Sequence, residues 1–110
     1  MRYYVIDEMP ELDLEKIKEH LNSKGVRSQM EEIFWIELPH EHMSIDQSEK
    51  KESHPYMFSI EVSRKEIRAE LFIRTLNSFN CEFQGFAIGE QRGFIMNYMD
   101  RMLENLQIQN

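Results

Sequence analysis

The residue types best suited to metal or acid–base chemistry lie together in one polar segment, residues 39–55. It holds three of the four histidines, His40, His42 and His54. Side chains two residues apart in an extended chain point to the same side, so His40 and His42 are placed to bind one metal ion. His54, at the far end of the segment, would supply a third imidazole. Imidazole ligands suit zinc, nickel, copper or iron, so a divalent transition metal such as zinc would fit this set.

The same segment also fits a simpler interpretation, a long solvated connection between two strands. Met43 and Ile45 are its only sizeable apolar residues, and most of the others are charged or polar. Loops of this length are usually functional or disordered, and a composition rich in Ser, Lys, Glu and Gln favours disorder. The H-x-H motif is short, and the chain has no second H-x-H and no C-x-x-C. The sequence therefore favours a disordered polar loop at 39–55 and no cofactor, with the metal site as the alternative.

The other candidates for catalysis are isolated residues. Cys81 is the only cysteine, so no internal disulfide forms, and its neighbour Glu82 disfavours a thiolate. Unpaired cysteines are among the most buried residues, and we expect Cys81 to be structural. His20 lies beside the apolar stripe of a predicted helix and is expected at its boundary with solvent. No Ser–His–Asp grouping can be argued from the sequence, which leans towards a protein that is not an enzyme.

The composition is that of one folded domain. A chain of 110 residues with 41% hydrophobic residues has a common domain size and can bury a core without a disulfide or a metal. A net charge of −7 disfavours nucleic acid as a partner, because binding phosphates requires Lys and Arg. No stretch approaches the roughly 18 apolar residues of a membrane span, and the apolar run near the N-terminus is too short for a signal peptide. We therefore expect a single cytoplasmic domain over 1–110.

Two helices are predicted, at 13–24 and 90–106, because apolar residues recur there at spacings of three and four. The first follows Pro10 with an acidic turn and ends at Lys24-Gly25, both of which are typical of helix ends. The second has a broad apolar face that includes several methionines and aromatic residues.

Strand patterns fill most of the remaining chain. Residues 2–7 and 31–38 are short runs of aromatic and β-branched residues, typical of strands, and Trp35 in the second run is expected in the core. Residues 56–62 alternate between apolar and other side chains, as a half-buried strand does. They would form a hairpin with the second run. Residues 80–88 predict one more strand.

Residues 64–76 fit two structures. As a strand, Ile67, Ala69 and Ile73 point to one side and Arg68 and Arg74 to the other. As a helix, the segment gains a capping box but places apolar side chains among charged ones. This conflict favours the strand.

The order of elements predicts an α+β two-layer sandwich, with a mainly antiparallel sheet of about four to five strands and both helices on one face. If residues 64–76 were helical instead, the order would be β-α-β-β-α-β with an additional C-terminal helix, a ferredoxin-like fold.

The last helix supplies the candidate binding surface. Phe94, Met96, Tyr98 and Met102 widen its apolar face beyond the stripe that a sheet would cover. Methionine-rich surfaces adapt to partner proteins, and two-fold dimers are the commonest oligomers. The sequence therefore predicts a small non-enzymatic protein-binding or regulatory module that binds a protein partner or a second copy of itself. The alternative is a metal-binding protein or metal-dependent enzyme that uses the histidines of segment 39–55.

Overall fold

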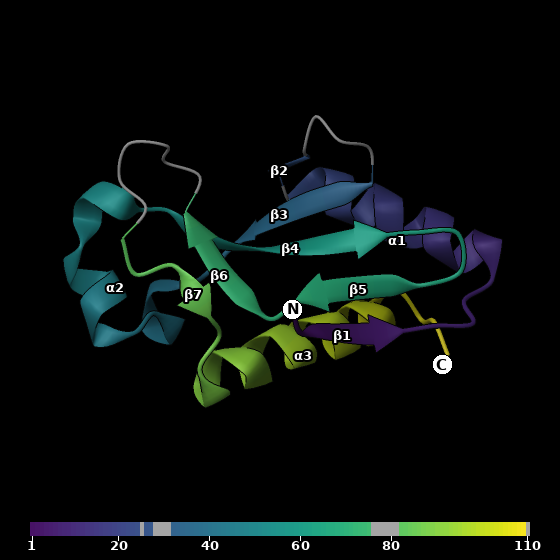
Figure 1. The fold of residues 1–110 in the computed structure, drawn as a ribbon. Helices are drawn as coiled ribbons and strands as arrows, with labels where there is room; N and C mark the ends of the chain where they lie inside the picture. Colours follow the sequence, from purple (N-terminus) through teal and green to yellow (C-terminus); the bar gives the residue numbers. More distant parts are fainter. Residues whose placement is uncertain (25, 28–31, 76–81, 110) are drawn as a thin grey trace.

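An antiparallel sheet forms the frame of the molecule (Figure 1). The computed structural model describes residues 1–24, 26–27, 32–75 and 82–109. In these ranges the strands run in the order β1-β5-β4-β3-β2, with β6 pairing with β4 and β7 with β6. Their bounds are β1 Tyr3–Ile6, β2 Val26–Arg27, β3 Ile33–Glu37, β4 Tyr56–Val62, β5 Ile67–Glu70, β6 Phe72–Thr75 and β7 Gly85–Phe86.

Two long helices cover one face of the sheet, α1 (Glu11–Lys24) and α3 (Gly89–Asn105). Figure 1 shows both of them behind the strands. They match the helices predicted at 13–24 and 90–106. The α+β two-layer sandwich is therefore confirmed, and the molecule is a single compact domain of this class.

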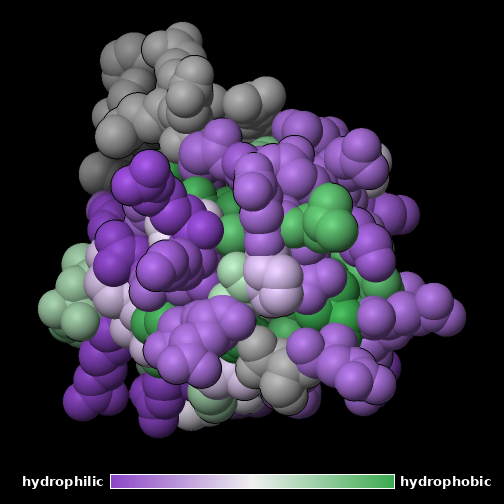
Figure 2. All heavy atoms as spheres, turned by 90° about the vertical axis from the view of Figure 1, so that its right-hand side faces the viewer, coloured by the Kyte–Doolittle hydropathy of each residue, from purple (hydrophilic) through white to green (hydrophobic). Residues whose placement is uncertain are grey.

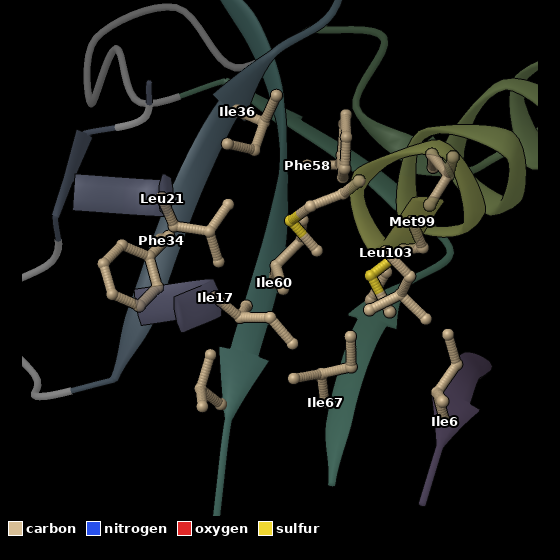
Figure 3. Close-up of a cluster of buried hydrophobic side chains, with 14 of the residues drawn as sticks. Ile6, Ile17, Leu21, Phe34, Ile36, Phe58, Ile60, Ile67, Met99 and Leu103 are labelled. Carbon is tan, nitrogen blue, oxygen red and sulfur yellow. The ribbon is translucent and has the colours of Figure 1, made fainter. Parts of the chain in front are cut away.

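The core lies between the sheet and the two helices (Figure 3). The strand register places apolar side chains of neighbouring strands side by side on the inner face, for example Phe34 with Ile60 and Ile36 with Phe58. The helices complete this layer with three residues of α1 and four of α3, namely Leu14, Ile17, Leu21, Ile95, Met99, Met102 and Leu103. The predicted apolar faces of both helices are thus the buried ones.

The opposite face of the sheet has no helix over it in the described part of the chain. Trp35 lies on this face, where it pairs with Ser59, and it is only half-buried. The prediction that Trp35 belongs to the core is therefore wrong. Successive side chains of a strand alternate between faces, and burial of Phe34 and Ile36 leaves Trp35 on the outside.

The described part of the segment 64–76 forms the strands β5 and β6, as the favoured interpretation predicted, and the ferredoxin-like alternative is wrong. The chain turns after β4, runs back as β5 and breaks at Leu71 before β6. Ile67 and Ala69 pair with Val62 and Ile60, so their apolar side chains join the core. The strand predicted at 80–88 is reduced to the two residues of β7, and residues 80 and 81 lie outside the described ranges.

The segment predicted as a disordered loop forms three short helices, η1 (His40–His42), α2 (Ile45–Glu49) and η2 (Lys51–Ser53). We call residues 40–53 the helical insert. A capping box opens α2, in which the Ser44 hydroxyl accepts from the Gln47 amide and the Gln47 side chain accepts from the Ser44 amide. The composition favoured disorder, but this local cap and the burial of Gln47 favour order.

The end of the molecule at the β4–β5 turn is covered mainly by hydrophilic side chains, with hydrophobic ones visible between them (Figure 2). No helix in the described ranges has the length and apolar character that a membrane crossing requires.

Candidate functional site

A groove of about 680 Å³ lies between α1 and α3 and is closed at one end by the helical insert. The last turns of α1 contribute His20 and Lys24, and η1 contributes His42. The remaining lining residues belong to α3. We call this cavity the α1–α3 groove.

The aromatic side of the groove is built on the core. Phe94 and Tyr98 are half-buried residues one helical turn apart on α3, with ring centroids 6.3 Å apart. Both rings meet the buried Phe58 of β4 edge-on, at 6.0 and 5.7 Å. Met102 continues the same side of the helix into the groove. The sheet therefore fixes an apolar surface that faces the groove.

Tyr98 supplies a polar end to this surface. Burial raises the pKa of its phenol above the ordinary value, because desolvation disfavours the charged phenolate. Tyr98 is thus a neutral hydroxyl throughout the physiological pH range.

The helical insert is attached to α3 through His42. Its Nδ1 lies 2.5 Å from Oε1 of Glu90, and its ring stacks on Phe94 with centroids 4.2 Å apart. Its backbone oxygen accepts a hydrogen bond of 3.0 Å from the Gln91 side chain. A carboxylate beside Nδ1 holds the proton on that nitrogen. The ring of His42 is therefore fixed at the insert end of the groove.

Two cationic side chains also line the groove, Lys24 from α1 and Arg101 from α3. Neither has an ion-pair partner among the described residues, as is true of several other surface cations such as Lys16 and Arg64. His20 lies with them, and its pKa is lowered by burial and by the charge of Lys24. The groove thus combines an apolar side with two cations, and the carboxylate of Glu90 also lines it.

The lowered pKa of His20 predicts a pH effect on stability. In the acidic range the unfolded chain binds a proton at this residue more readily than the folded one, so stability falls as the pH drops. Urea unfolding of the wild type and of His20→Gln, measured from about pH 7 to about pH 5, is expected to show the steeper loss for the wild type. Parallel curves for the two proteins would show that His20 is not destabilised by its surroundings.

The three histidines predicted to bind a metal have separate surroundings. His54 Nε2 lies 2.7 Å from the Gln47 carbonyl oxygen, and its ring meets Tyr56 edge-on. His40 is exposed, and His42 is held by Glu90. Within the described residues no three His, Cys, Asp or Glu side chains come close enough to hold a metal ion. The metal site stays a prediction without a geometric basis in this structure, and Cys81 lies outside the described ranges.

The predicted interface residues divide into two sets. Phe94, Tyr98 and Met102 all line the α1–α3 groove. Met96 lies on another side of α3 and does not line it. No pattern in the sequence marked Lys24 and Arg101 as site residues, because they line one groove only in the folded chain.

Comparison of the chain with protein-family models, with curated proteins and with solved structures finds no match.

Proposed function

We propose that this chain is a non-enzymatic protein-binding module, and that the α1–α3 groove binds a short segment of a partner protein. The segment presents an apolar side chain next to a carboxylate. The observation that supports this most is the pairing of an apolar surface with Lys24 and Arg101, two cations without ion-pair partners among the described residues.

The apolar side favours a large side chain of the partner. Phe94 and Tyr98 offer aromatic surface that is only partly covered in the free chain, and the buried Met102 lies beside them in the groove wall. Burying one Leu or Phe side chain contributes about 1.5–3 kcal/mol, and aromatic pairs add about 0.5–1.5 kcal/mol. One such residue supplies at most about 4.5 kcal/mol, close to the roughly 4.1 kcal/mol of a millimolar dissociation constant, so tighter binding needs the polar contacts as well.

The cations favour an acidic residue in the same segment. The chain as a whole is acidic, with a net charge of −7, and it repels acidic partners at long range. Salt screens this repulsion beyond about 8 Å at physiological ionic strength, while a carboxylate inside the groove lies beside Lys24 and Arg101. The positive charge inside the groove therefore favours an acidic segment of the partner, although the net negative charge of the chain does not.

Binding is better supported than catalysis. The His42–Glu90 pair has the form of a base held by a carboxylate, but such a pair needs a nucleophile or substrate-activating group within reach. The groove residues of the described chain include no Ser, Thr or Cys. The pair instead attaches the insert to α3 and shapes the groove.

The test begins with a random peptide library displayed on phage and selected against the wild type. We expect enriched sequences with an acidic residue next to an aromatic or aliphatic one. A synthetic peptide of that sequence, followed by fluorescence anisotropy, should bind Tyr98→Ala and Arg101→Glu roughly tenfold more weakly, the effect of about 1.4 kcal/mol. Met96→Ala is the matched control, since it truncates a methionine of the same helix outside the groove.

Arg101 is exposed, so its charge reversal tests the groove without disturbing the core. Failure to enrich any peptide, or equal binding to the wild type and both groove variants, would overturn the proposal.

A further inference from the structure

Among the strands of the described residues, β1 lies at an edge of the sheet. It pairs with β5 on one side, and it ends the strand order. Figure 1 shows it along the lower rim of the sheet, with α3 behind it and no strand beyond it. An edge strand presents unpaired N–H and C=O groups that can pair with another chain.

The pattern of hydrogen bonds between β1 and β5 determines which backbone groups of β1 point outwards. The Leu71 amide donates to the Arg2 carbonyl oxygen at 2.9 Å. Residues of an antiparallel pair alternate in bonding to their neighbour, so Tyr4 and Ile6 bond towards β5. Tyr3 and Val5 therefore direct their N–H and C=O groups away from the sheet. Their side chains are 39% and 44% exposed.

The charges around β1 identify the partner that fits. The strand itself has no charged residue, which native edges commonly use to prevent pairing. Arg2 precedes it, and Asp7 and Glu8 follow it. When two copies of this strand pair antiparallel, the basic end of each meets the acidic end of the other. The strand is thus charge-complementary to itself in that orientation.

We propose that two copies of the chain associate through their β1 strands and form one continuous antiparallel sheet. The two-fold axis passes between the Tyr4 residues of the two copies. Tyr3 of each copy therefore faces Val5 of the other. The outward N–H and C=O groups of these two residues then form about four hydrogen bonds between the copies.

Helix α3 supports the same edge from behind. The Tyr4 hydroxyl donates to Asp100 at 2.6 Å, and Met96 lies one turn before Asp100 on the same side of the helix. Met96 is half-buried and becomes part of the contact between copies. A strand of four residues gives a small interface, below the roughly 1,200 Å² of stable complexes. The dimer is therefore weak and forms at high protein concentration.

The association is measured by sedimentation velocity of the full chain over roughly 10 µM to 1 mM, the range that a small interface implies. Val5→Pro removes an N–H that points outwards, and proline is tolerated at such edge positions. We expect it to keep the fold by circular dichroism and to weaken association roughly tenfold or more. Tyr98→Glu, in the α1–α3 groove, should leave association unchanged and is the matched control.

A charge exchange tests the orientation. Arg2→Glu places acidic residues at both ends of the strand, and the double variant Asp7→Lys with Glu8→Lys places basic residues at both ends. Each variant alone should stay monomeric at low salt, while their mixture should form a heterodimer. A wild type that is monomeric at the highest concentration would overturn the proposal, as would dimers that Val5→Pro does not weaken or variants that do not associate when mixed.

Discussion

Replacing Phe58 with alanine is expected to lower the free energy of unfolding by about 3–5 kcal/mol. The Phe58 side chain is 0% exposed and lies on β4, which pairs with β3, β5 and β6. Its removal leaves a cavity beneath Phe94 and Tyr98, whose rings it supports edge-on. Proteins of this size are stable by only about 5–15 kcal/mol, so the loss is a large part of the total. Urea unfolding followed by circular dichroism measures it.

Trp35→Ala is the matched control for this substitution. Trp35 is a larger aromatic residue on the neighbouring strand, but it lies half-buried on the opposite face of the sheet. Its truncation should cost less, because part of its surface is already in contact with water. An equal or greater loss for Trp35→Ala would contradict the assignment of the two faces.

Phe58 also shows what periodicity predicts well. The alternation in residues 56–62 predicted a half-buried strand, and Phe58, Ile60 and Val62 are buried on its inner face. The three- and four-residue spacing in α3 likewise predicted the burial of Ile95 and Met99. In both elements one face is more apolar than the other, although Met57 on the other face of β4 is also buried. The sequence pattern therefore indicates which face of each element points to the core.

Trp35 shows where the same reasoning fails. The run at 31–38 has large apolar residues at successive positions, so alternation does not distinguish its two faces. The pairing of Phe34 with Ile60 and of Ile36 with Phe58 decides between them. Which face of β3 is buried therefore depends on its register with β4, and this register exists only in the assembled sheet.

The prediction for the helical insert failed for a related reason. The spacing of Ser44 and Gln47 is that of a capping box, but α2 has only five residues, too few to show helical periodicity. The contacts that keep it ordered come from Phe83 and Gln91, far along the chain. The composition of the segment does not indicate that these distant residues contact it.

The candidate site could be predicted in part. The apolar residues of α3 beyond its central stripe pointed to Phe94, Tyr98 and Met102, and these residues do line one groove. Lys24 and Arg101 are separated by most of the chain, and no local pattern relates them. A groove between two helices that are distant in sequence is a tertiary feature, and its charged residues could be identified only from the structure.

Replacing Gln91 with leucine is expected to destabilise the protein by about 2–4 kcal/mol and to loosen the helical insert. The Gln91 side chain is 1% exposed. Its Nε2 donates to the Gln47 Oε1 at 2.9 Å and to the His42 carbonyl oxygen at 3.0 Å, and its Oε1 accepts from the Ile88 amide at 3.1 Å. Leucine fills similar space but leaves these groups without this partner, and a buried polar group without a hydrogen bond costs about 1–3 kcal/mol.

Amide hydrogen exchange separates the two parts of this effect. Backbone amides of the insert, such as those of Ser48 and Lys50, should exchange faster in Gln91→Leu. Amides at the centre of α3 should change only with global stability. Gln109→Leu, an exposed position near the end of the chain, is the control for adding leucine at a glutamine. Unchanged protection in the insert would show that Gln91 does not hold it in place.

A double-mutant cycle then measures the bond between the two glutamines. Gln47 is also buried, and it donates to the Phe83 carbonyl oxygen at 2.8 Å, so Gln47→Leu is destabilising by itself. Because Gln47 and Gln91 share a hydrogen bond, the double variant should cost less than the sum of the single ones, with a coupling of about 0.5–3 kcal/mol. Additive losses would mean that each glutamine acts only through its backbone partners. The insert would then be attached to α3 mainly through His42, Glu90 and the ring of Phe94.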